Sequence, residues 1–122
     1  MSDSYFSEDE LRCKCGCGVS NFSDATLHKL NKLRKLFGKP INLSSAYRCP
    51  VYNRQIGATQ THASGQAVDI LIGYRDAYKL MSLLYPLGFT GIGVKQKGKS
   101  RFIHIDDLPP GENRPRPHVW SY

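Results

Sequence analysis

The chain has 122 residues, of which 40% are hydrophobic and 11% aromatic. This length fits one compact domain and leaves no room for a second domain of ordinary size. No run approaches the roughly 20 apolar residues that a membrane-spanning helix needs, so we expect a soluble protein. The formal charge of +7 favours encounters with polyanions, but nucleic acid, anionic lipid and anionic cell-wall polymer all satisfy it.

We interpret residues 1–122 as a single domain in which residues 1–22 form a polar, cysteine-rich lead segment. The first residues are acidic and lack the positive start and apolar run of a secretory signal. We therefore expect a protein that is made in a host cytoplasm without a signal peptide. Gly16 and Gly18 break any regular period at the end of this segment.

The four cysteines leave three alternatives open. Three of them lie within five residues, whereas small structural zinc sites more often separate two cysteines by a two-residue gap. A second, structural metal would use all four side chains: Cys13, Cys15, Cys17 and Cys49. A disulfide from Cys49 to one of the other three would need an oxidising compartment, and free thiols are the third alternative.

The clearest helix pattern follows the lead segment. Ser23 or Asp24 provides an N-cap, and Gly38 stands just past the C-terminal end. Apolar side chains between them recur at spacings of three and four, at Leu27, Leu30, Leu33 and Phe37. Residues 41–44 then alternate like a short strand, and residues 50–56 are predicted to form a short helix that begins at a proline.

The second half of the chain alternates strand and helix patterns. Residues 67–72 form a β-branched run of strand length, and residues 74–85 show helical spacing. Residues 89–94 and 101–106 are predicted to form a hairpin, followed by a Pro- and Arg-rich tail from residue 109. Because these elements lack strict βαβ alternation, we predict an α+β fold, an antiparallel sheet with helices packed against it.

Asp69 is a misfit in its predicted strand, because a buried carboxylate is costly unless it is paired or bound to a metal. His62 precedes it by seven residues, and Gly65 between them allows close backbone approach. Taken alone, Asp69 also fits a paired carboxylate, and His104 a buried histidine. Catalytic zinc takes three protein ligands and keeps a fourth position for water, so we predict a zinc site at His62, Asp69 and His104.

Two motifs carry a resemblance to a known family. Residues 61–69 read Thr-His-Ala-Ser-Gly-Gln-Ala-Val-Asp, and residues 102–106 read Phe-Ile-His-Ile-Asp. Both resemble zinc D-Ala-D-Ala carboxypeptidases and phage endolysin L-alanyl-D-glutamate peptidases, which share a fold with the hedgehog signalling domain. The resemblance extends over about residues 10–122. It implies a hedgehog/DD-peptidase-like fold. It also implies a peptidase with one catalytic Zn²⁺ that cleaves either the terminal D-Ala-D-Ala bond or the L-Ala-D-Glu bond of peptidoglycan stem peptides.

The resemblance also implies roles for residues around the metal. Arg48, in the segment Ser-Ser-Ala-Tyr-Arg, would lie near the substrate carbonyl or carboxylate, where its planar charged fork suits anionic oxygens. Tyr47, in the same segment as Arg48, and Thr61, the first residue of the 61–69 motif, are candidate substrate-binding residues. Trp120 either lines a substrate groove or anchors the C-terminus on the core.

The general base is absent from its usual place. Many relatives carry an acid three residues before the last histidine or a second histidine two before it, where this chain has Arg101 and Phe102. Asp106 is the nearest carboxylate candidate, although side chains two apart on a strand share a face, so it can equally orient His104. His118 is a second candidate.

These interpretations fix the expected partners. We expect a monomer that acts on bacterial peptidoglycan at the cell wall or periplasm, with no nucleic acid and no membrane insertion. The chain is expected to come from a phage or prophage and to reach the wall through host lysis or a partner's pore, such as a holin. The alternative is a non-catalytic, zinc-containing wall-binding or virion structural module, which the missing acid before His104 favours.

Overall fold

The structure is a computed structural model that describes residues 4–13, 21–48 and 64–122. The predicted helix at residues 50–56 lies outside this part of the chain. The elements in the described residues are, in chain order, α1 (Glu8–Leu11), α2 (Asp24–Phe37), β1 (Asn42–Ser45), β2 (Ala67–Leu71), α4 (Tyr74–Leu84), β3 (Gly91–Lys95), β4 (Phe102–Asp106) and β5 (His118–Ser121).

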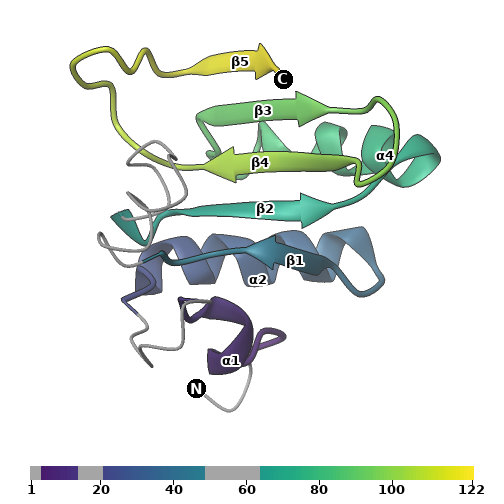
Figure 1. Cartoon of the computed structure of the whole chain (residues 1–122). Helices are drawn as coiled ribbons and strands as arrows, with labels where there is room; N and C mark the ends of the chain where they lie inside the picture. The colour runs from purple at the N-terminus through teal and green to yellow at the C-terminus, as the bar shows by residue number, and fades with distance from the viewer. Residues whose placement is uncertain (1–3, 14–20, 49–63) are drawn as a thin grey trace.

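The strands form one sheet with the order β1-β2-β4-β3-β5 (Figure 1). Three of its pairings are antiparallel, including the predicted hairpin of β3 and β4, whereas β5 runs parallel to β3. The α+β class is therefore confirmed, but the sheet is mixed and not antiparallel as predicted. The difference comes from the tail: residues 107–117 carry the chain back along the sheet before β5 begins, so β5 enters in the same direction as β3.

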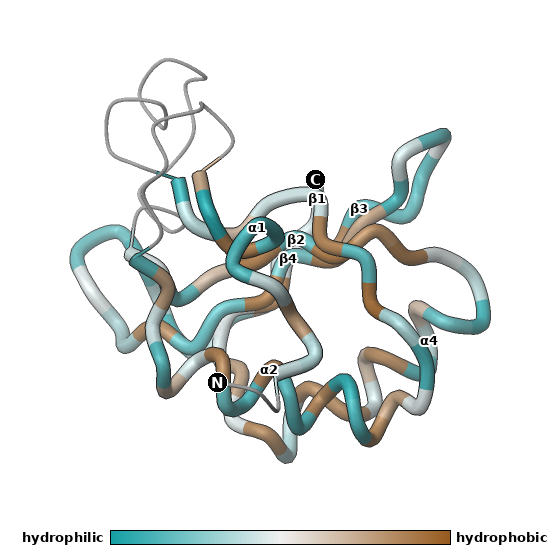
Figure 2. Tube along the Cα trace, turned by 90° about the horizontal axis from the view of Figure 1, so that it is seen from below, coloured by the Kyte–Doolittle hydropathy of each residue, from teal (hydrophilic) through white to brown (hydrophobic). Residues whose placement is uncertain are grey.

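Both long helices cover the same face of the sheet (Figures 1 and 2). Helix α2 begins as predicted, because the Ser23 side chain accepts a hydrogen bond from the Thr26 amide, and it ends at Gly38 in the left-handed region. Apolar side chains of α2 and α4 meet those of the central strands in one core, which includes Leu30, Leu33, Phe37, Leu80, Leu84, Val68, Ile70, Ile103 and Ile105. No helix in the described ranges is long and apolar enough to span a membrane.

The lead segment is more structured than its polar composition predicts. Helix α1 has a capping box, in which Ser7 and Glu10 bond each other's backbone amides. Phe6 and Leu11 on either side of it belong to the core, and the Leu11 carbonyl accepts a hydrogen bond from the Tyr47 amide. The Ser-x-x-Glu spacing is a sequence signal for this helix start. α1 thus holds the end of β1, which leads toward Arg48.

Candidate metal centre

The candidate site lies on the face of the sheet opposite α2 and α4, which we call the site face. Val68 and Ile70 of β2 and the isoleucines of β4 point into the core, so the alternate residues on each strand point to the site face. Asp69 and His104 are direct cross-strand partners in the β2–β4 pairing. This pairing brings two of the three predicted metal ligands together.

His104 stands between two carboxylates. Its Nδ1 lies 3.0 Å from Oδ1 of Asp69, and its Nε2 lies 2.8 Å from Oδ2 of Asp106. His104 as a whole residue is 2% exposed. Burial lowers the pKa of His104, but the hydrogen bonds and charges of Asp106 and Asp69 outweigh burial and raise the pKa above 6.5.

Asp106 is fully buried and receives a second cation. Arg116 Nε donates to Oδ1 at 2.9 Å and Nη2 donates to Oδ2 at 2.7 Å, a two-point fork from a side chain that is only 4% exposed. Burial alone would raise the pKa of Asp106, but the hydrogen bonds from His104 and Arg116 and their charges lower it to about 2. An ionised carboxylate only accepts hydrogen bonds, so Nε2 of His104 is a proton donor to Asp106.

These contacts bear on the predicted roles of Asp106. Both of its oxygens are engaged, and neither is exposed to a substrate. Of the two roles predicted from the sequence, the contacts favour the orientation of His104 and weigh against the general base. The other candidate base, His118, is exposed on β5 and stacks on Trp120 with ring centroids 5.7 Å apart.

Trp120 covers part of the site face. Its position on β5 lies opposite Gly93 of β3, which in turn lies opposite His104. A Cβ at Gly93 would come within 2.5 Å of the indole Nε1, so the missing side chain leaves room for the indole. The Trp120 ring lies 5.2 Å from the His104 ring. Of the two predicted alternatives for Trp120, its position beside His104 favours the substrate groove.

Arg48 and Tyr47 follow β1 at the edge of the same face. Arg48 Nη2 lies 3.8 Å from Asp69 Oδ2, so the guanidinium reaches the predicted metal ligand. Its side chain is 16% exposed, which leaves part of the fork open to an anionic group. Tyr47 is buried, which weighs against the predicted direct contact of its side chain with substrate.

The segment that enters β2 is fixed to the start of α2. Gly65 has φ +75°, and a Cβ there would clash with the Asn21 carbonyl oxygen, so glycine is required by both space and backbone. The Gly65 carbonyl accepts a hydrogen bond from the Ser23 amide at 2.7 Å. The close backbone approach predicted for this glycine is confirmed, and it determines where the chain turns into the strand that carries Asp69.

The donor set of Asp69 and His104 fits zinc. Asp69 Oδ1 and His104 Nδ1 approach to 3.0 Å, near the roughly 3.3 Å between two ligand atoms of a tetrahedron with bonds of about 2.05 Å. Asp106 behind the ring gives the carboxylate–histidine arrangement that commonly supports a metal-binding histidine. Among the described side chains no three of His, Cys, Asp or Glu form a metal-binding group. Predicted ligand His62 and neighbouring Thr61 lie outside them.

The cysteine alternatives stay open. Cys13 is buried, while the other three cysteines fall outside the described part of the chain. A second metal and a disulfide therefore both remain predictions.

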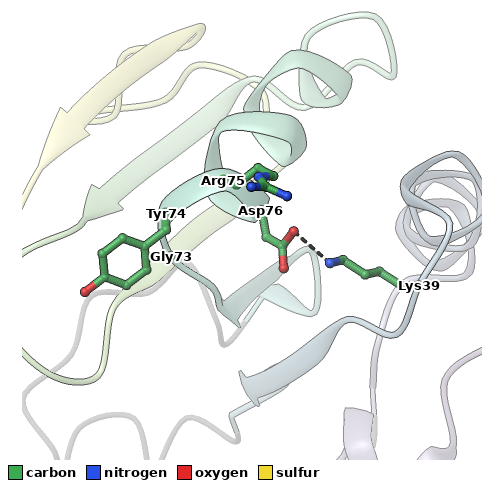
Figure 3. Close-up of a pocket in the computed structure, with 5 residues that line it drawn as sticks. All are labelled: Lys39, Gly73, Tyr74, Arg75 and Asp76. Atoms are coloured by element: carbon green, nitrogen blue, oxygen red, sulfur yellow. Dashed lines mark ion pairs between the residues drawn. The ribbon is translucent and has the colours of Figure 1, made fainter.

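A hollow at the start of α4 shares no residue with the candidate site. It is lined by Lys39, Gly73, Tyr74, Arg75 and Asp76, and an ion pair of 2.8 Å joins Lys39 Nζ to Asp76 Oδ1 (Figure 3). One carboxylate that is already paired with a lysine does not make a metal site. The chemistry therefore centres on Asp69 and His104.

An aspartate and a histidine that converge from neighbouring strands, with a carboxylate behind the histidine, form an arrangement that metal sites of hydrolases use. The sequence model of the Peptidase M15 family matches residues 4–106, and the chain belongs to this family. It is a metallopeptidase, and M15 peptidases depend on zinc. The comparison with individual curated proteins finds no match.

Sequence reasoning assigned no role to three residues that shape the site: Arg116, Gly91 and Gly93. Two glycines within one predicted strand are a signal of close approach by another group, and each of these lies under a neighbouring side chain. Arg116 begins the closing Arg-Pro-x-x-Trp-Ser-Tyr segment, which also fits the family resemblance, but a Pro- and Arg-rich tail has no period from which a partner for its side chain can be inferred.

Proposed function

We propose that the chain is a zinc-dependent peptidase that hydrolyses stem peptides of bacterial peptidoglycan. The observation that supports it most is the 3.0 Å approach of Asp69 and His104 across β2 and β4, in a chain of the M15 family. His62, seven residues before Asp69, is the proposed third ligand. Both the zinc dependence and the peptidoglycan substrate follow the family.

In this proposal each residue of the site has a separate role. His62, Asp69 and His104 hold the metal, which when bound polarises the scissile carbonyl and lowers the pKa of its water. Asp106 holds the His104 ring through Nε2. Arg48, beside Asp69, binds the substrate's carbonyl or carboxylate oxygen.

Trp120 forms a wall of the groove beside the His104 ring. His118 is the proposed general base, because it is exposed two residues before Trp120 on β5 and its ring stacks on the indole, whereas both oxygens of Asp106 are already bonded. Replacing His118 by glutamine should lower kcat while zinc affinity stays at the wild-type value. A full loss of zinc binding in this variant would contradict the role of a base.

The bond that is cut has two candidates. A carboxypeptidase releases the terminal D-Ala of the stem and needs a cation for the free carboxylate, which Arg48 can supply. An endopeptidase of the endolysin kind cuts between L-Ala and D-Glu. Both outcomes are read from the products: free D-Ala in the first case, and a new free amine on Glu in the second.

The test is mass spectrometry of purified peptidoglycan after incubation with the zinc-loaded protein. His62→Ala should abolish product and reduce bound zinc. His28→Ala is the matched control, because His28 is exposed on α2, on the opposite side of the sheet. Stoichiometric zinc without any product from the wild type would support the alternative, a non-catalytic wall-binding or virion module.

A further inference from the structure

The guanidinium of Arg116 is almost completely enclosed at the candidate site. Arg116 lies in the connection between β4 and β5, outside residues 4–106 that match the family. Its side chain is 4% exposed, and its carboxylate partner, Asp106, is fully buried. Burying a guanidinium and a carboxylate is costly unless their geometry is good, so the two-point fork between them is a built feature.

The surroundings of Arg116 are shaped for this fork. Gly91 of β3 lies under it: a Cβ there would clash with Asp106 Oδ1 and come within 2.5 Å of Arg116 Nε. The Arg116 guanidinium also lies over the Trp120 ring, 5.1 Å from its centroid, and Nη1 donates to the Pro115 carbonyl at 2.7 Å. Three separate contacts therefore fix its orientation.

Asp106 connects the Arg116 fork to His104, the predicted metal ligand. Asp106 Oδ2 accepts from Arg116 Nη2 at 2.7 Å and from His104 Nε2 at 2.8 Å. Asp106 Oδ1 accepts from Arg116 Nε and from the Leu108 amide. The two charge-assisted bonds from Arg116 and the backbone bond from Leu108 hold the carboxylate in one orientation. The hydrogen bond from Nε2 to this carboxylate then fixes the orientation of the His104 ring.

We propose that Arg116 is a positioning residue for zinc: through Asp106 it fixes His104 with the proton on Nε2 and with Nδ1 directed at the metal beside Asp69. The proposal rests on the proposed zinc site but not on the identity of the substrate. Lysine does not replace arginine here, because an ammonium lacks the planar two-point fork and the flat face that stacks on Trp120. In this role Arg116 acts on the His104 ring through Asp106.

The test compares Arg116→Gln and Arg116→Lys with the matched control Arg114→Gln. Arg114 lies two residues away in the same connection, and its Nε bonds only the Pro109 carbonyl, so its replacement removes the same charge without touching Asp106. The first readout is the zinc dissociation constant, measured by competition with a chelator. The second is the NMR signal of the His104 Nε2–H proton in the zinc-loaded protein and its rate of exchange with water.

Arg116→Gln is expected to weaken zinc binding about 10- to 100-fold relative to Arg114→Gln and to speed exchange of the Nε2–H proton. Arg116→Lys should fall between the two. A zinc dissociation constant within about threefold of the control, with an unchanged Nε2–H signal, would overturn the proposal. If Arg116→Gln does not fold, the same criterion applied to Arg116→Lys decides.

Neither readout uses peptidoglycan, so failure of the inference and failure of the proposed function are distinct. A wild type that binds zinc but yields no peptidoglycan product overturns the proposed function alone. A wild type that binds no zinc overturns both. Normal zinc binding by Arg116→Gln, together with product from the wild type, overturns only the role of Arg116.

Discussion

Replacing Asp106 by asparagine should remove an acid-sensitive contribution to the stability of the metal-free protein. The pKa of this carboxyl falls from its ordinary value of 3.8 to about 2 in the fold. At about 1.4 kcal/mol per pKa unit, this difference corresponds to roughly 2 kcal/mol of stability. Because the pKa is lowered on folding, the contribution is fully present above pH 4 and is lost as the pH falls through about 2.

The assay is urea denaturation of wild type and Asp106→Asn with a chelator present, at pH values between 6 and 2. The free energy of unfolding of the wild type should exceed that of the variant by about 2 kcal/mol more at pH 6 than at pH 2. Titrating groups that do not contact Asp106 are shared by the two proteins and cancel in this difference, whereas the pKa of His104, which Asp106 raises, changes with the substitution. A gap that stays constant over the whole range would refute the claim that the fold holds Asp106 ionised.

Three further predictions concern neighbouring groups. Gly93→Ala places a Cβ within 2.5 Å of the Trp120 indole; it should shift the fluorescence of this single tryptophan and lower kcat/KM about tenfold or more, and an unchanged spectrum would contradict it. Thr26→Val removes the 2.8 Å hydrogen bond to Asp107 and should lower the free energy of unfolding by about 1–2 kcal/mol in urea. The pKa of His104 is raised above 6.5, and a proton on this histidine competes with zinc. As the pH is lowered, zinc affinity measured by chelator competition should therefore begin to fall while the pH is still above 6.5. A fall that begins only below pH 6.5 would contradict this.

The elements that sequence patterns predicted are those with local signals. Helix α2 has its cap, its apolar period and its glycine within one short stretch, and no distant contact is needed to recognise it. Strand β5 was missed because it has four residues after a Pro-rich connection and pairs with only one neighbour. Its direction depends on the path of residues 107–117, which no local propensity specifies.

The residues of the candidate site show the same difference between local sequence signals and tertiary contacts. Asp69 was informative because a carboxylate conflicts with an apolar strand. A histidine between two isoleucines is not informative alone, and His104 gained its predicted role mainly from His62 and Asp69. Arg116 has no such conflict with its own surroundings in the sequence. Its role arises from tertiary contacts with Asp106 and Trp120, which come together only when the tail returns along β3.

The two faces of the sheet depend on one another. Because side chains alternate along a strand, a slip of β4 by one residue against β2 would place His104 in the core and an isoleucine on the site face. The burial of Ile103 and Ile105 against α2 and α4 opposes such a slip at a cost of about 1.5–3 kcal/mol for each side chain left exposed. The apolar core therefore fixes the register in which His104 meets Asp69. A metal site on central strands gains its precision from the packing behind it, and the fork of Arg116 then needs to set only the rotation of one ring.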